Sequence, residues 1–120
     1  MLSDEHWRRL FAAVDARQTE EFLTFLTPEA FFRYGSNAPA VGRRAIASVV
    51  EELFASIRCS EHRLLQTWSG AGSAVCQGEV GYVRLDGRSI VLPFCNIFGL
   101  RDGRIHRYEI YIDPTPLMAP

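Results

Sequence analysis

The stretch that most constrains the fold runs from residue 88 to residue 113, because its backbone pairing can be read from the sequence. Two segments rich in Ile, Val, Phe and Tyr flank Arg101-Asp102-Gly103-Arg104, and an Asp-Gly pair supplies the positive φ that a tight hairpin requires. The sequence therefore predicts a long antiparallel hairpin. Because side chains alternate along a strand, one face would carry Leu92, Phe94, Asn96, Phe98, Tyr108, Ile110 and Ile112, and the other Val91, Cys95, Ile97, Arg107, Glu109 and Tyr111.

The residues before this hairpin change from helical to strand periodicity. Apolar residues at helical spacing predict helices over about 3–17, 19–27 and 43–57, with a brief strand at 31–34 between the last two. Alternation from residue 61 onward predicts further strands at 62–68 and 73–85. Pro93 and Gly81 interrupt strands and suggest a bent sheet. We expect one α+β domain over residues 1–120, with three N-terminal helices on one face of a curved antiparallel sheet.

Size and composition narrow the classes of function. A chain of 120 residues can bury a core without a metal or disulfides, and its three cysteines, widely spaced and without a C-x-x-C pair, predict a reducing compartment and no zinc site. A net charge of -1 with mixed signs argues against nucleic acid, and the absence of Lys excludes lysine Schiff-base chemistry. Without an apolar run of membrane-spanning length or a secretory leader, we expect a cytoplasmic protein with no membrane association.

Three stretches carry a family resemblance that spans almost the whole chain: NAPAVGRRAI (37–46), GEVGYVRLDGRSIVLPF (78–94) and LRDGRIHRYEIYIDPTPL (100–117). With this order of elements the chain resembles the nuclear transport factor 2-like superfamily, in particular its SnoaL-like members, which include polyketide cyclases, ketosteroid isomerases and limonene epoxide hydrolases. The resemblance implies a cone-shaped sheet whose concave face is covered by the helices and encloses an apolar pocket, with no cofactor. Since the scaffold hosts many chemistries, the resemblance alone does not choose a reaction.

The epoxide hydrolases of this superfamily use an Arg-x-Asp pair on the third main strand and an Asp on the last strand. Matching the strands through the two Asp-Gly turns places Glu79, Gly81 and Ile110 at those positions. The hydrolase residues are therefore missing, and epoxide hydrolysis is not expected. The isomerase pattern, an Asp base with a Tyr and a protonated Asp, is not found at matching positions either.

Four residues are candidates for acid–base catalysis. With this register Glu79 points into the cone, where burial would favour its neutral form; the alternative, with equal weight, is a salt bridge to an arginine or a turn toward solvent. Asn96 on the inner face must bond to a neighbour or a ligand, and the neighbour is the commoner case. Tyr108 could donate from its hydroxyl. His62 could exchange protons near neutral pH, although a lone strand histidine is more often structural.

The candidate substrate-binding residues are Tyr34, Asn37, Phe54, Phe94, Phe98 and Ile110. Asn37 lies in a loop that resembles the water-binding loop of the hydrolases, but an asparagine in a turn more commonly has only a structural role. Together these residues predict a cofactor-free enzyme that performs cyclisation, isomerisation or dehydration on a small hydrophobic molecule. A non-catalytic binding or sensing module for an apolar ligand, or a structural dimerisation module, remains open.

The outer face of the predicted sheet would expose a broad apolar patch. We assign to it Val80, Tyr82, Val91, Cys95, Ile97 and Tyr111. Monomers rarely expose a patch of this size, so the sequence predicts a homodimer joined through the sheets.

Overall fold

The computed structural model describes residues 2–120. Its elements in chain order are α1 (Asp4–Asp15), α2 (Thr19–Leu23), β1 (Leu26–Tyr34), β2 (Ala40–Val41), α3 (Arg43–Ala55), β3 (Ile57–Ser69), β4 (Ser73–Arg84), β5 (Ser89–Arg101), β6 (Arg104–Ile112) and α4 (Thr115–Met118). Helices α1, α2 and α3 occur where the three N-terminal helices were predicted, but α2 ends at Leu23 and not near residue 27. Strand β1 already begins at Leu26 and is longer than the strand predicted at 31–34. Strand β2 and helix α4 were not predicted. Within residues 2–120 no helix combines the length and apolar character needed to cross a membrane.

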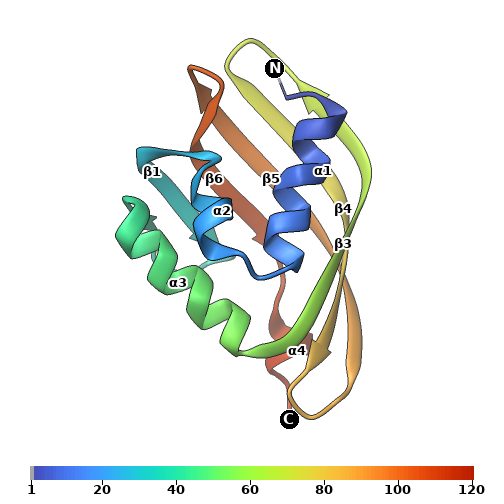
Figure 1. The fold of residues 1–120 in the computed structure, drawn as a ribbon. Helices are drawn as coiled ribbons and strands as arrows, with labels where there is room; N and C mark the ends of the chain where they lie inside the picture. The colour runs from blue at the N-terminus through green and yellow to red at the C-terminus, as the bar shows by residue number, and fades with distance from the viewer. Residues whose placement is uncertain (1) are drawn as a thin grey trace.

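The six strands form one curved sheet in the order β2-β1-β6-β5-β4-β3. Strands β3 to β6 form the predicted antiparallel meander, and the helices α1, α2 and α3 lie across one face of the sheet (Figure 1). The predicted α+β class is thus confirmed. The sheet is mixed, however, because β1 pairs with β6 in the parallel direction. No turn connects these two strands, so no local signal in the sequence reports their relative direction.

The strand register shifts at irregularities in β3, between β5 and β6 and between β1 and β6, whereas the pairing of β4 with β5 is regular at Gly81 and Pro93, where bulges were predicted. One bulge in β3 lies between Leu64 and Gln66, opposite Gly78. A Cβ atom at Gly78 would overlap the carbonyl oxygen of Arg63, so the close approach of the two strands requires glycine here.

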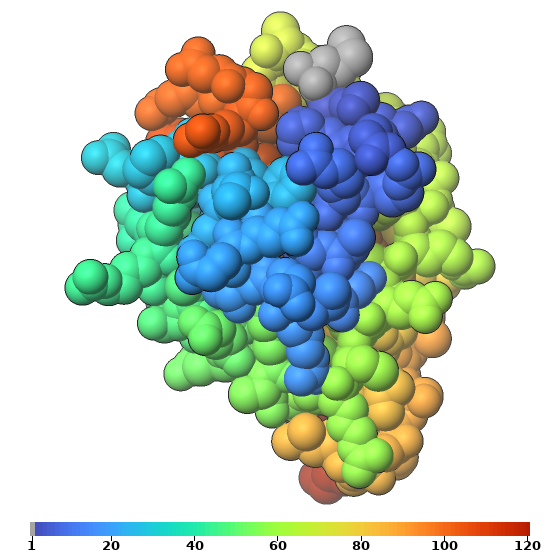
Figure 2. Space-filling model, in the orientation of Figure 1, coloured from blue at the N-terminus to red at the C-terminus, as the bar shows by residue number. Residues whose placement is uncertain are grey.

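The helices fill one end of the concave face with side chains and leave the other end less densely filled. Ser3 caps α1 by accepting a hydrogen bond from the His6 amide at 3.2 Å, and α1 then packs Trp7 on Phe98 with ring centroids 5.4 Å apart. Phe98 also meets Tyr108 edge to face at 4.5 Å. Figure 2 shows the side chains of α1, α2 and α3 closing over this face of the sheet.

Candidate functional site

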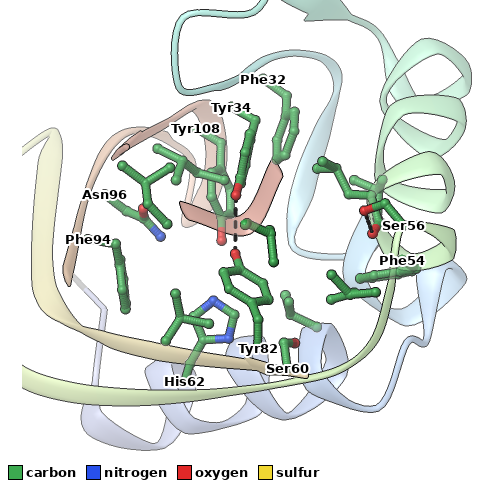
Figure 3. A pocket seen from close by; sticks show the side chains of 18 of the residues that line it. Phe32, Tyr34, Phe54, Ser56, Ser60, His62, Tyr82, Phe94, Asn96 and Tyr108 are labelled. Atoms are coloured by element: carbon green, nitrogen blue, oxygen red, sulfur yellow. Dashed lines mark hydrogen bonds between the residues drawn. The ribbon is translucent and has the colours of Figure 1, made fainter. Parts of the chain in front are cut away.

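A cavity lies between the concave face of the sheet, the C-terminal half of α3 and the short helix α4 (Figure 3). The hollow amounts to about 750 Å³ with its open mouth included, but the part wide enough for a water-sized sphere is about 70 Å³. Ser56 and Met118 are exposed members of its lining, so the mouth lies near the end of α3 and α4. The lining is mostly apolar, with a few polar side chains from β1, β3, β4, β5 and β6.

Most of the predicted site residues meet at this cavity. They are His62, Asn96, Tyr108, Tyr34, Phe54, Phe94 and Ile110. All four from the hairpin of β5 and β6 have the predicted inward direction. The turn at Asp102 and Gly103 has the positive φ values, 52° and 78°, that the Asp-Gly pair predicts, and a bulge between Gly99 and Leu100 then brings Asn96 opposite Ile110 on the inner face.

The prediction that Glu79 points into the pocket is wrong. Glu79 lies on the outer face of β4, where its carboxylate forms an ion pair with Arg63 on the neighbouring strand. Its side chain is 37% exposed and that of Arg63 is 71% exposed. The alternative reading of Glu79 as a salt-bridged strand residue is therefore the correct one.

The error at Glu79 comes from the length of one loop. A two-residue turn at Asp86 and Gly87 would place Glu79 opposite Phe94, on the inner face. The loop is one residue longer, since Val83 pairs with Ser89, and Glu79 lies opposite Pro93 instead. Because side chains alternate, a slip of one residue moves every side chain of the strand to the other face. Val80 and Tyr82, predicted outside, therefore line the cavity.

Two predicted binding residues lie elsewhere. Asn37 is exposed in the turn after β1, where its backbone N–H donates to the carbonyl oxygen of Tyr34 at 3.1 Å. The interpretation of Asn37 as an ordinary turn residue is therefore correct. Phe98 is completely buried between Trp7 and Tyr108 and belongs to the core. Neither residue lines the cavity.

His62 is the one imidazole of the cavity lining, and it is held by a carboxylate that the sequence analysis did not single out. Its Nδ1 lies 2.6 Å from Oδ1 of Asp15, and its backbone N–H donates to Oδ2 of Asp15 at 2.8 Å. The side chain of His62 is 12% exposed. Its ring packs between Phe11, at 4.9 Å, and Phe94, at 5.3 Å. With Nδ1 occupied by Asp15, Nε2 is the ring nitrogen left for a ligand.

The Asp15 carboxylate is charged, although its position opposes charge. Asp15 ends α1, where the helix dipole disfavours a negative group and no basic residue stands in the last turn. Burial acts to raise the pKa of Asp15, but hydrogen bonds from His62 and Ser60 and the positive charge that His62 carries when protonated outweigh it, and the pKa is lowered. The pair thus has the arrangement of an oriented general base.

Three tyrosines contribute hydroxyls to the same cavity as His62. Those of Tyr34 and Tyr82 are 3.3 Å apart, and Figure 3 shows the hydroxyl of Tyr108 beside them. Burial raises the pKa of all three phenols, and for Tyr82 the neighbouring Tyr34 adds to the effect. At neutral pH they are therefore uncharged hydroxyls that can donate a hydrogen bond to a ligand oxygen.

Asn96 contributes an amide with unused hydrogen-bonding capacity. The residue is 2% exposed, and no partner among residues 2–120 reaches its Oδ1. A buried acceptor without a partner is costly, so Oδ1 is suited to a ligand group that donates a hydrogen bond, whereas Nδ2 is the donor of this side chain.

The cysteines are not part of this chemistry. Cys76 pairs with Asn96 across β4 and β5, and burial raises the pKa of its thiol to about 12, which keeps it protonated. No group of three or more His, Cys, Asp or Glu side chains within residues 2–120 is arranged to hold a metal ion.

The fold and the cavity define the chain as an α+β cone protein with an apolar pocket, and comparison with known proteins gives the family. The model of the SnoaL-like domain matches residues 7–108, and the chain belongs to this family. No curated protein matches it.

Several solved structures have the same fold. An NTF2-like protein of unknown function from Burkholderia pseudomallei has a TM-score of 0.86 and 16% identity, with 93% of this chain and 91% of that chain covered. TerC, crystallised with polyporic acid, has a TM-score of 0.83 and 18% identity over 95% and 93%. A protein with a ketosteroid isomerase-like fold from Catenulispora acidiphila, in complex with trimethylamine, has a TM-score of 0.82 and 14% identity over 91% and 85%.

Proposed function

We propose that this protein is a cofactor-free enzyme in which His62, oriented by Asp15, moves a proton on a small, mainly apolar carbonyl compound. The observation that carries the proposal is the 2.6 Å contact between Nδ1 of His62 and the Asp15 carboxylate at the wall of an apolar cavity. A carboxylate in this position holds the neutral ring with its proton on Nδ1 and stabilises the imidazolium that forms when Nε2 accepts a proton.

The other polar groups of the cavity are suited to stabilise the negative charge that this proton transfer creates. Removal of a proton from a carbon next to a carbonyl places negative charge on the carbonyl oxygen. Nδ2 of Asn96 and the hydroxyls of Tyr34, Tyr82 and Tyr108 are uncharged donors that could stabilise this oxygen. Return of the proton to another carbon is an isomerisation, its delivery to a leaving hydroxyl is a dehydration, and attack of the carbanion on a second carbonyl is a cyclisation.

The volume of the cavity also limits the size of the ligand. Its free space of about 70 Å³ is well below the roughly 300–1,000 Å³ of ordinary ligand pockets, so a ring-sized ligand requires Leu117 and Met118 at the mouth to move outward. Two structural neighbours support a cyclic oxygenated substrate. TerC was crystallised with polyporic acid, and a Xanthomonas campestris neighbour with 21% identity is described as a polyketide cyclase.

Deuterium exchange of simple ketones tests this proposal without knowledge of the natural substrate. Cyclopentanone and cyclohexenone are incubated with the protein in heavy water, and NMR follows both their binding and the loss of protons next to the carbonyl. We expect binding and exchange faster than in buffer alone. Binding without accelerated exchange would favour a non-catalytic binding module, and the absence of both binding and exchange would favour a structural module. Either outcome would contradict the proposed enzyme.

A further inference from the structure

We infer that Ser60 is a positioning residue for this site, because its hydroxyl fixes the Asp15 carboxylate in the orientation that keeps the proton of His62 on Nδ1. Ser60 and His62 lie two residues apart on the same face of β3, and both reach the end of α1. The hydroxyl of Ser60 donates to Oδ1 of Asp15 at 2.8 Å. The same oxygen lies 2.6 Å from Nδ1 of His62.

The hydrogen bonds fix the carboxylate at both of its oxygens. Oδ2 of Asp15 accepts the backbone N–H of His62 at 2.8 Å, while Oδ1 is shared by Ser60 and the imidazole. The backbone bond alone would still let the carboxylate turn about its Cβ–Cγ bond. The Ser60 hydroxyl removes this freedom, because it draws Oδ1 toward β3 and into line with Nδ1.

The location of Asp15 explains why it needs this third donor. The carboxylate ends α1, where the carbonyl groups of the last turn disfavour negative charge. Arg17, two residues later, does not compensate, since its guanidinium donates to the carbonyls of Ile57 and Arg58. The phenols of Tyr82 from β4 and Tyr108 from β6 also lie within reach of the Asp15 charge, which helps to raise the pKa of both.

The inference rests on the proposed role of His62, but it is tested without a substrate. Nitrogen-15 NMR of the His62 ring above about pH 8, where imidazole is ordinarily uncharged, reports which nitrogen carries the proton. In the wild type we expect the Nδ1–H tautomer. In Ser60→Ala the Nε2–H tautomer should appear, and the pKa of the Asp15 carboxyl should rise because a donor to its charged form is lost. Ser60→Thr, which keeps the hydroxyl, should restore both properties.

Ser56→Ala is the matched control, because Ser56 also lines the cavity but donates to the carbonyl of Leu53 and not to Asp15. It should leave the tautomer and the Asp15 titration unchanged. If Ser60→Ala is too unstable for NMR, Ser60→Cys gives the same test with a weak donor of similar size. An unchanged tautomer together with an unchanged Asp15 titration in folded Ser60→Ala would overturn the inference. If the wild type does not accelerate ketone exchange, the proposed enzymatic function is rejected, but the role of Ser60 in fixing the His62 tautomer is not affected.

Discussion

At the scale of single residues, Asp15 is the position where helix stability and site geometry oppose each other. An acid at the end of a helix lowers helix stability, and α1 contains no basic residue nearby to offset it. Three hydrogen bonds from β3 stabilise the Asp15 carboxylate at this unfavourable position. The sequence alone did not reveal this conflict, because Arg17 stands two residues after Asp15 and only the structure shows its guanidinium bound to the carbonyls of Ile57 and Arg58.

The first prediction concerns Asp15→Asn and pH. The folded-state pKa of Asp15 lies below its ordinary value of 3.8, so the charged carboxylate adds stability above that pH, and this contribution is lost as the pH falls through the folded-state pKa. Asp15→Asn should thus be less stable than the wild type at neutral pH, with a difference that shrinks in acid. Urea unfolding of both proteins at several pH values measures it; a difference that grows toward low pH would contradict the assignment.

The second prediction concerns Glu79→Gln. Since Glu79 pairs with a largely exposed Arg63 on the outer face, the substitution should change the free energy of unfolding by no more than about 1 kcal/mol. It should also leave ligand binding in the cavity unaltered. Thermal unfolding and ketone binding by NMR check the two statements, and weaker binding by this variant would mean that Glu79 reaches the cavity.

The same residues show how far the sequence predicts the site. Alternation within β5 and within β6 located Asn96, Phe94, Tyr108 and Ile110, but the two-residue turn alone would pair Asn96 with Glu109. A bulge between Gly99 and Leu100 shifts the pairing by one residue and places Asn96 opposite Ile110. Alternation along β4 failed, because Asp86 and Gly87 lie in a three-residue loop together with Leu85, and the Asp-Gly pair does not report this extra residue. The contact between Asp15 and His62 joins residues 47 positions apart, and no local pattern predicts it.

At the scale of elements, α3 combines a structural half and a site half. Ile46 is buried in the core, Val50 is buried and borders the cavity, and Leu53 and Phe54 are half-buried and line the cavity. The periodicity of α3 correctly predicted one apolar stripe, but it could not separate side chains that fill the core from those that border an empty space.

The third prediction follows from this division. Ile46→Ala should lower the free energy of unfolding by about 2–5 kcal/mol, because a completely buried side chain leaves a cavity, and Leu53→Ala should cost less. Glu52→Ala, at an exposed position of the same helix, is the control and should change little. Chemical denaturation of the three variants gives the order; an equal loss for Ile46→Ala and Glu52→Ala would show that the phase of α3 is wrong.

At the scale of the whole molecule, the outer face of the sheet leaves apolar side chains in water. Val91 is 63% exposed, Tyr111 49% and Ile97 37%. The patch is smaller than the sequence predicted, because Val80 and Tyr82 face the cavity. Together with Cys95 these three side chains lie on the adjacent strands β5 and β6. We propose that a second copy of the chain covers this face.

The fourth prediction tests this assembly. Sedimentation at micromolar concentration should show a dimer for the wild type and a monomer for Val91→Asp, since a charge at the centre of an apolar interface is costly. Leu85→Asp, at an equally exposed apolar position in the loop between β4 and β5, should remain a dimer. A monomeric wild type would reject the proposal.

The central claim is that His62, and no other group at the cavity, accepts the proton. The most direct measurement is the rate of deuterium exchange into cyclopentanone for the wild type, His62→Gln and Glu79→Gln under the same conditions. We predict that Glu79→Gln exchanges at the wild-type rate, while His62→Gln loses about a hundredfold or more and still binds the ketone. Unchanged exchange in His62→Gln, or its loss in Glu79→Gln, would contradict the account.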